Sequence, residues 1–214
     1  MKLAKWLIPI LVLLSMPAVV ETAPVAQWEL GVVLTRTPDV KNGAVLYRDC
    51  AACHGAKGEG VSDGSIPALG GQSYTVVAKQ IVDFRAEARI DPRMVHFTDS
   101  RHLAFSQPIA DVALYIAKLP PPAAKQAPAG IDLVLGAMAY ARVCARCHDE
   151  LGQGKEDTLA PRLAGQHYIY IMKQLDSAAD GSRATLARSH ADLVRTLDRK
   201  ELEAVAGWLG TLTP

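Results

Sequence analysis

The sequence lacks the charge imbalance and the aromatic content that would indicate several common functions. It carries 23 lysines and arginines against 22 aspartates and glutamates, a formal net charge of +1. Nucleic-acid binding needs a clustered positive surface, so this balance excludes it as the main function. Aromatic residues make up only 6% of the chain, although 50% of its residues are hydrophobic. The composition is that of a globular protein, and we expect something besides aromatic packing to fill its interior.

The hydrophobic run at the amino terminus is shorter than a membrane-spanning helix. It covers residues 6–20, which is 15 residues, whereas a helix needs about 20 to cross a bilayer. Lys2 and Lys5 precede it, as in a secretory signal peptide. We therefore predict that residues 1–23 are a signal peptide and that the mature protein is periplasmic. No clear cleavage triplet of small residues lies between Ala18 and Ala26, so a retained membrane anchor is the alternative.

No cysteine is left over for a structural disulfide, because all four lie in two copies of the pattern Cys-x-x-Cys-His. The cysteines are Cys50, Cys53, Cys144 and Cys147, and the histidines are His54 and His148. This pattern attaches c-type haem. Two thiols one helical turn apart can bond to the two vinyl groups of one porphyrin, and the adjoining imidazole can bind its iron. The sequence therefore predicts two covalently bound c-type haems, which would supply much of the missing core.

Two other chemistries use a Cys-x-x-Cys pair. A thioredoxin-like redox pair lies beside a βαβ unit, and no such unit is visible in this sequence. Zinc ribbons pair two such motifs about 15–20 residues apart, whereas these motifs lie 94 residues apart and each carries its own histidine. Haem attachment is the interpretation that fits both copies.

The chain contains an internal duplication. Shifting the sequence by 94 residues aligns Cys50 with Cys144 and continues without a gap to His96 and His190, with 16 of these 47 positions identical. A period this long indicates two domains, since the units of solenoid repeats are about 20–50 residues long. Three consecutive prolines after Leu119 favour an extended spacer between them. We predict a first domain over residues 36–119, a Pro/Ala-rich linker over 120–130 and a second domain over 131–214.

Each half shows the same order of helical patterns, and no clearly alternating run indicates a strand. The predicted helices cover residues 40–50, 74–87 and 109–119 in the first half and 133–144, 168–179 and 199–212 in the second. The sequence therefore predicts an all-α protein.

Several segments around the haem motifs match a known pattern. They are residues 43–47 (Gly-Ala-Val-Leu-Tyr), 67–72 (Pro-x-Leu-x-Gly-Gln), 89–94 (Arg-x-Asp-Pro-x-Met) and 109–116. Over residues 36–212 the chain resembles the dihaem class I cytochromes of the cytochrome c4 type. The resemblance implies two tandem cytochrome c-like domains, each wrapped around one covalently bound haem with His and Met axial ligands. It also implies that the carbonyls of Pro67 and Pro161 accept a hydrogen bond from the ligand histidines.

The resemblance assigns Met94 as the sixth ligand of the first haem, because it follows Asp91-Pro92 where the family has its axial methionine. The second half breaks this pattern. The 94-residue shift places Arg188 opposite Met94, and a guanidinium is a poor ligand because it stays protonated. We predict that His190, two residues later, is the sixth ligand there, with an open iron or another ligand as alternatives. His96 occupies the same repeat position in the first half, so it is either a structural residue or a replacement for Met94.

These features predict an electron-transfer protein and not an enzyme, because no acid–base constellation accompanies the haem motifs. The expected partners are redox proteins, including a membrane-bound oxidase, reductase or dehydrogenase, with no nucleic acid and no small-molecule substrate. One alternative is a tethered cytochrome subunit of a respiratory or dehydrogenase complex that grips its partner with residues 27–38. Another is a haem enzyme with an open second iron, where Arg188 would stabilise an anion.

Overall fold

The structure, a computed structural model, describes residues 22–183 and 185–213, and this part of the chain is helical. Its helices are α1 (Thr22–Leu34), α2 (Val40–His54), α3 (Tyr74–Arg85), α4 (Pro92–Thr98), α5 (Ser106–Ala117), α6 (Leu133–Val143), α7 (Ala145–His148), α8 (Tyr168–Ala179), α9 (Arg188–Val194) and α10 (Arg199–Thr211). The only extended pairing among these residues is an isolated bridge between Lys155 and Ala160. The all-α prediction is confirmed, whereas α1, α4, α7 and α9 were not predicted. The predicted signal peptide lies mostly outside the described residues.

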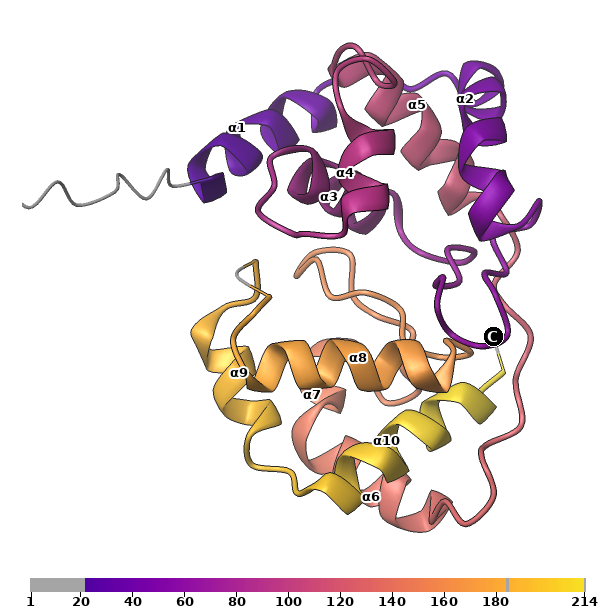
Figure 1. Ribbon diagram of the computed structural model, residues 1–214, viewed down its shortest axis with the longest axis vertical. Helices are drawn as coiled ribbons and strands as arrows, with labels where there is room; N and C mark the ends of the chain where they lie inside the picture. Colours follow the sequence, from indigo (N-terminus) through magenta and orange to yellow (C-terminus); the bar gives the residue numbers. More distant parts are fainter. Residues whose placement is uncertain (1–21, 184, 214) are drawn as a thin grey trace, which may run out of the picture.

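Each half builds its own hydrophobic core, one mainly from α1, α2, α3 and α5 and one from α6–α10. The two halves lie one above the other, with the linker running along one side (Figure 1). In each core the haem-motif helix crosses the last helix of its half at a glycine. A Cβ on Gly43 of α2 would lie 2.1 Å from the carbonyl oxygen of Asp111 in α5, and one on Gly136 of α6 would lie 2.2 Å from that of Ala204 in α10. Glycine at these positions lets the two helix backbones meet.

The two haem motifs differ by one residue in their spacing from an anchoring tyrosine. A tyrosine anchors each of them to the residue after the motif histidine. Tyr47 donates to the Gly55 carbonyl at 2.8 Å and Tyr140 to the Asp149 carbonyl at 2.7 Å. Cys50 lies three residues after the first tyrosine, but Cys144 lies four after the second. The extra residue coincides with the break between α6 and α7, whereas α2 runs unbroken to His54.

Helix α1 packs on the first domain, ahead of its predicted start at residue 36. It buries Ala26 and Val33, and Glu29 pairs with Arg85 of α3 at 3.1 Å. Its other side is apolar too, with Trp28 72% exposed. Because α1 is hydrophobic on both sides, its sequence lacks the one-sided pattern that predicts an amphipathic helix. Within the described part of the chain, no helix has the length and apolarity of a membrane span.

A symmetric set of backbone hydrogen bonds joins the two domains. Gln72 donates to the Arg162 carbonyl at 2.7 Å and accepts from the Arg162 amide at 3.0 Å. Gln166, its repeat equivalent, donates to the Ala68 carbonyl at 2.9 Å and accepts from the Ala68 amide at 3.0 Å. The extended linker is held beside this interface, where the Lys125 amide donates to the Gly210 carbonyl at 2.8 Å. The duplication thus builds a pseudo-two-fold interface between its own copies.

We expect Gly136→Ala to lower the free energy of unfolding by about 1–3 kcal/mol, because the new methyl group meets backbone and not a mobile side chain. The matched control is Gly31→Ala in α1, where a Cβ meets nothing within 4 Å. That change should raise stability by about 0.5–1 kcal/mol through helix propensity. Denaturant unfolding of the haem-loaded protein measures both. Equal effects of the two substitutions would contradict the close approach of α6 and α10.

Candidate haem sites

The helices place two cysteines in each domain, and no disulfide joins any of the four. Cys50 and Cys144 are half-buried, whereas Cys53 and Cys147 are exposed. Burial raises the pKa of Cys50 to about 11 and that of Cys144 to about 12. The Cys-x-x-Cys-His spacing of each pair suits attachment of a porphyrin.

Each motif histidine is buried and held by a proline carbonyl. His54 Nδ1 lies 3.0 Å from the Pro67 carbonyl oxygen, and His148 Nδ1 lies 2.9 Å from that of Pro161. Both contacts were expected from the resemblance. A proton on Nδ1 leaves the lone pair of Nε2 free to bind a metal. Burial lowers the pKa of both imidazoles, which favours the neutral form that ligates iron.

In the second domain His190 faces His148. The two ring centres are 6.3 Å apart and the ring planes are inclined by 73°. Metal–imidazole bonds are about 2 Å long, so two imidazoles on opposite sides of one metal have ring centres roughly 6 Å apart. The observed separation therefore suits one iron between the two rings.

Helix register makes His190 the counterpart of Met94. Met94 is the third residue of α4, and His190 is the third residue of α9. The backbone agrees, since the first helical bonds run from the Val95 amide to the Asp91 carbonyl and from the Ala191 amide to the Ala187 carbonyl. These positions differ by 96 residues and not by 94. The expectations that Arg188 replaces Met94 and that His190 matches His96 are therefore wrong, because the second half has two more residues before its short helix.

His96 lies at the surface of the first domain. It is exposed, and its ring packs at 4.6 Å from the ring of His102 and at 5.1 Å from that of Phe97. Met94 is partly buried on the preceding turn, where its carbonyl accepts a hydrogen bond from Thr98. This arrangement favours Met94 over His96 as the sixth ligand of the first haem.

A known protein family matches both halves of the chain. The sequence profile of the family described as Cytochrome c matches residues 40–120 and 133–213. The chain belongs to the Cytochrome c family.

Two relatives of this cytochrome carry different names. "Cytochrome c4" of Azotobacter vinelandii is 27% identical over 177 residues, which cover 75% of this chain and 82% of the relative. The "Thiosulfate dehydrogenase electron acceptor" of Thiomonas intermedia is 33% identical over 172 residues, 75% of this chain and 76% of the relative. Together these matches identify a dihaem electron-transfer cytochrome with two covalently attached c-type haems.

Two solved structures share its fold. The reduced cytochrome c4 of Pseudomonas stutzeri superposes with a TM-score of 0.72 at 24% identity, over 82% of this chain and all of that chain. Thiosulfate dehydrogenase of Marichromatium purpuratum superposes with a TM-score of 0.70 at 28% identity, over 81% of this chain and 40% of that chain.

Buried polar atoms around the second site fit a haem in this cytochrome. Arg183 Nε, Thr185 Oγ1 and His190 Nδ1 are buried, and none has a hydrogen-bond partner among the described residues. Burial, reinforced by the positive charge of Arg89, lowers the pKa of Arg183 to about 10. A buried guanidinium is stabilised by a carboxylate partner. Haem propionates are carboxylates, so they would supply this partner to Arg183.

Repeated polar residues link the two haem regions across the domain interface. Arg89 donates to Gln174 at 2.9 Å and to the Tyr170 hydroxyl at 2.7 Å, and Arg183 donates to Gln80 at 3.2 Å. Sequence comparison of the halves finds the recurrence of Arg89 and Arg183 but not their reach into the opposite domain.

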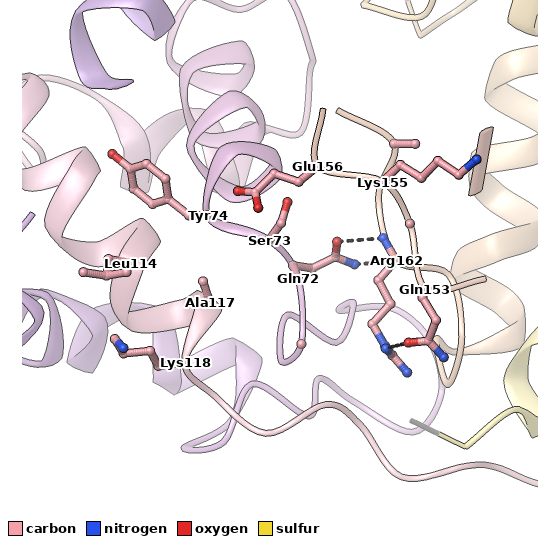
Figure 2. Close-up of a pocket in the computed structure, with 13 residues that line it drawn as sticks. Gln72, Ser73, Tyr74, Leu114, Ala117, Lys118, Gln153, Lys155, Glu156 and Arg162 are labelled. Carbon is pink, nitrogen blue, oxygen red and sulfur yellow. Dashed lines mark hydrogen bonds between the residues drawn. The ribbon is translucent and has the colours of Figure 1, made fainter. Parts of the chain in front are cut away.

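The interface also contains the glutamine pair described above. Figure 2 shows Gln72 of the first domain bonded to the backbone of Arg162 in the second. His167 is buried in the same interface, where its Nε2 lies 2.9 Å from the Glu59 carbonyl oxygen. This contact gives His167 a structural role at the interface.

Replacing Cys144 and Cys147 together with serine should halve the haem content, from two haems to one per chain, because serine cannot form the thioethers. The control is Arg146→Ala. It changes a residue of the same motif that forms no bond to haem, so this variant should retain both haems. Haem is quantified per chain by the pyridine haemochrome spectrum. Retention of two covalently bound haems in the double serine variant would contradict the assignment.

Proposed function

We propose that this cytochrome is a periplasmic electron carrier whose two haems have unlike axial ligands. Cys50 and Cys53 attach the first haem, which His54 and Met94 ligate. Cys144 and Cys147 attach the second haem, which His148 and His190 ligate. The observation that carries this proposal is the 6.3 Å separation of the His148 and His190 rings.

The register of α9 supports the same ligand. Starting the helix at Arg188 turns the third residue, His190, toward His148. Arg188 precedes it in the first turn, so this guanidinium does not take the ligand position. An imidazole at the ligand position favours a closed iron, which speaks for electron transfer and against the alternative of an enzyme with an open second iron.

When bound, each haem supplies one-electron iron chemistry, and the chain sets the potential at which it operates. A methionine ligand raises the potential, so the first haem is the preferred resting site for an electron. Pro67 and Pro161 hold the proximal imidazoles through Nδ1. Arg183 places a positive charge near both His148 and His190 and lowers the pKa of each ring, after burial. The same charge would stabilise the reduced form of the second haem.

The second candidate is an electron-accepting subunit of a dehydrogenase. The relative from Thiomonas intermedia is named as the electron acceptor of thiosulfate dehydrogenase. The fold match to thiosulfate dehydrogenase of Marichromatium purpuratum covers 40% of that chain, so the present chain would correspond to a part of such an assembly. Both candidate functions use redox-protein partners, and the proposed axial ligands are compatible with either function.

Carbon monoxide tests the ligand assignment. The dithionite-reduced protein should give the same visible spectrum before and after carbon monoxide is added, because strong ligands close both irons. His190→Ala opens one iron, so half of its haem absorbance should shift. The control, His96→Ala, changes an exposed histidine that is not a proposed ligand and should behave like the unmodified protein. A shift of about half the haem in the unmodified protein would contradict ligation by His190 and favour the enzyme alternative.

A further inference from the structure

A cluster of three metal-binding side chains lies on the first domain, outside both haem motifs. His96 is on the last part of α4, Asp99 caps this helix, and His102 follows in the next turn. One ligand atom from each residue lies within 4.8 Å of the others. Side chains from one short segment therefore converge on a single point at the protein surface.

The geometry points to a binding site for a divalent transition-metal ion such as Zn²⁺, held by His96, Asp99 and His102. Imidazole nitrogen and carboxylate oxygen are common ligands of Zn²⁺, at about 2 Å. Two ligand atoms on one ion are then roughly 3 Å apart. Asp99 Oδ1 and His102 Nδ1 are 2.9 Å apart, so the ion could replace the proton between them.

The surrounding bonds prepare this ligand set. Asp99 Oδ1 accepts from the backbone amides of Arg101 and His102, which fixes the carboxylate. The hydrogen bond from His102, followed by that from Arg101, holds the pKa of Asp99 well below its usual range. Asp99 is therefore ionised at neutral pH. Arg101 donates a hydrogen bond to the other carboxylate oxygen, Asp99 Oδ2, at 2.7 Å. The Arg101 side chain is 80% exposed, so it can move aside when an ion binds.

The second domain provides an internal comparison. In the register that pairs Met94 with His190, the counterparts of the three ligands are Asp192, Arg195 and Asp198. Arg195 pairs with Asp192 at 3.1 Å, so an ion pair takes the place of the histidine cluster. We therefore expect one Zn²⁺ per chain, bound by the first domain alone.

Calorimetric titration of the protein carrying both haems with Zn²⁺ tests this site. We expect saturable binding of one Zn²⁺ per chain, and we expect His96→Ala and His102→Ala each to weaken it by about tenfold or more. Asp192→Ala removes the counterpart carboxyl in the second domain and should leave the affinity unchanged. Visible spectra check that each variant retains both haems.

The absence of saturable Zn²⁺ binding, or equal affinity in both histidine variants and the unmodified protein, would overturn the proposal. If His96→Ala disturbs the haem beside Met94, His102→Ala decides alone, since His102 lies beyond the end of α4. An equal loss of binding in Asp192→Ala would also overturn it, because that result would place the ion elsewhere. These outcomes do not depend on which residues ligate the haem irons.

Discussion

The hydrogen bond between each haem-motif histidine and a proline carbonyl is the contact on which each domain is organised. It fixes a buried imidazole through Nδ1. A short helix of seven residues, α4 or α9, carries the second ligand that we propose for each haem. The residue at which that helix begins decides which side chain takes the proposed ligand position. In the second domain this side chain is His190, whose ring centre lies 6.3 Å from that of His148.

The rest of the duplicated structure holds the haem-motif helices in place and joins the two domains. Glycines at 43 and 136 let the motif helices touch α5 and α10. Gln72 and Gln166 join the domains through matching backbone bonds. The scaffold is therefore nearly symmetric, while the third residue of the short helix differs, Met94 in α4 and His190 in α9. The unlike ligands that we propose would give the two haems different potentials on this symmetric scaffold.

Much of this could be predicted from the sequence, because the decisive signals are local. The Cys-x-x-Cys-His spacing and the helical patterns around it identify the haem motifs and the main helices. Helix α1 escaped prediction because Trp28 and its neighbours make it apolar on both sides. The cross-domain contacts of Arg89 and Arg183 escaped because a repeated residue does not reveal which domain it reaches.

The register of α9 could not be obtained from the repeat alone. The 94-residue shift matched His96 with His190 because the residues are identical, although their backbones lie at different points of the short helices. Only the helical hydrogen bonds from Val95 to Asp91 and from Ala191 to Ala187 reveal the two-residue offset. The position of His190 opposite His148 therefore follows from the backbone of α9 and not from the repeat.

Near-infrared magnetic circular dichroism of the oxidised protein tests the central claim most directly, because its charge-transfer bands report the axial ligand pair of each low-spin haem. The account predicts two bands of equal weight, one from a His/Met haem and one from a His/His haem. Two His/Met bands, or a high-spin signal from half of the haem, would contradict it.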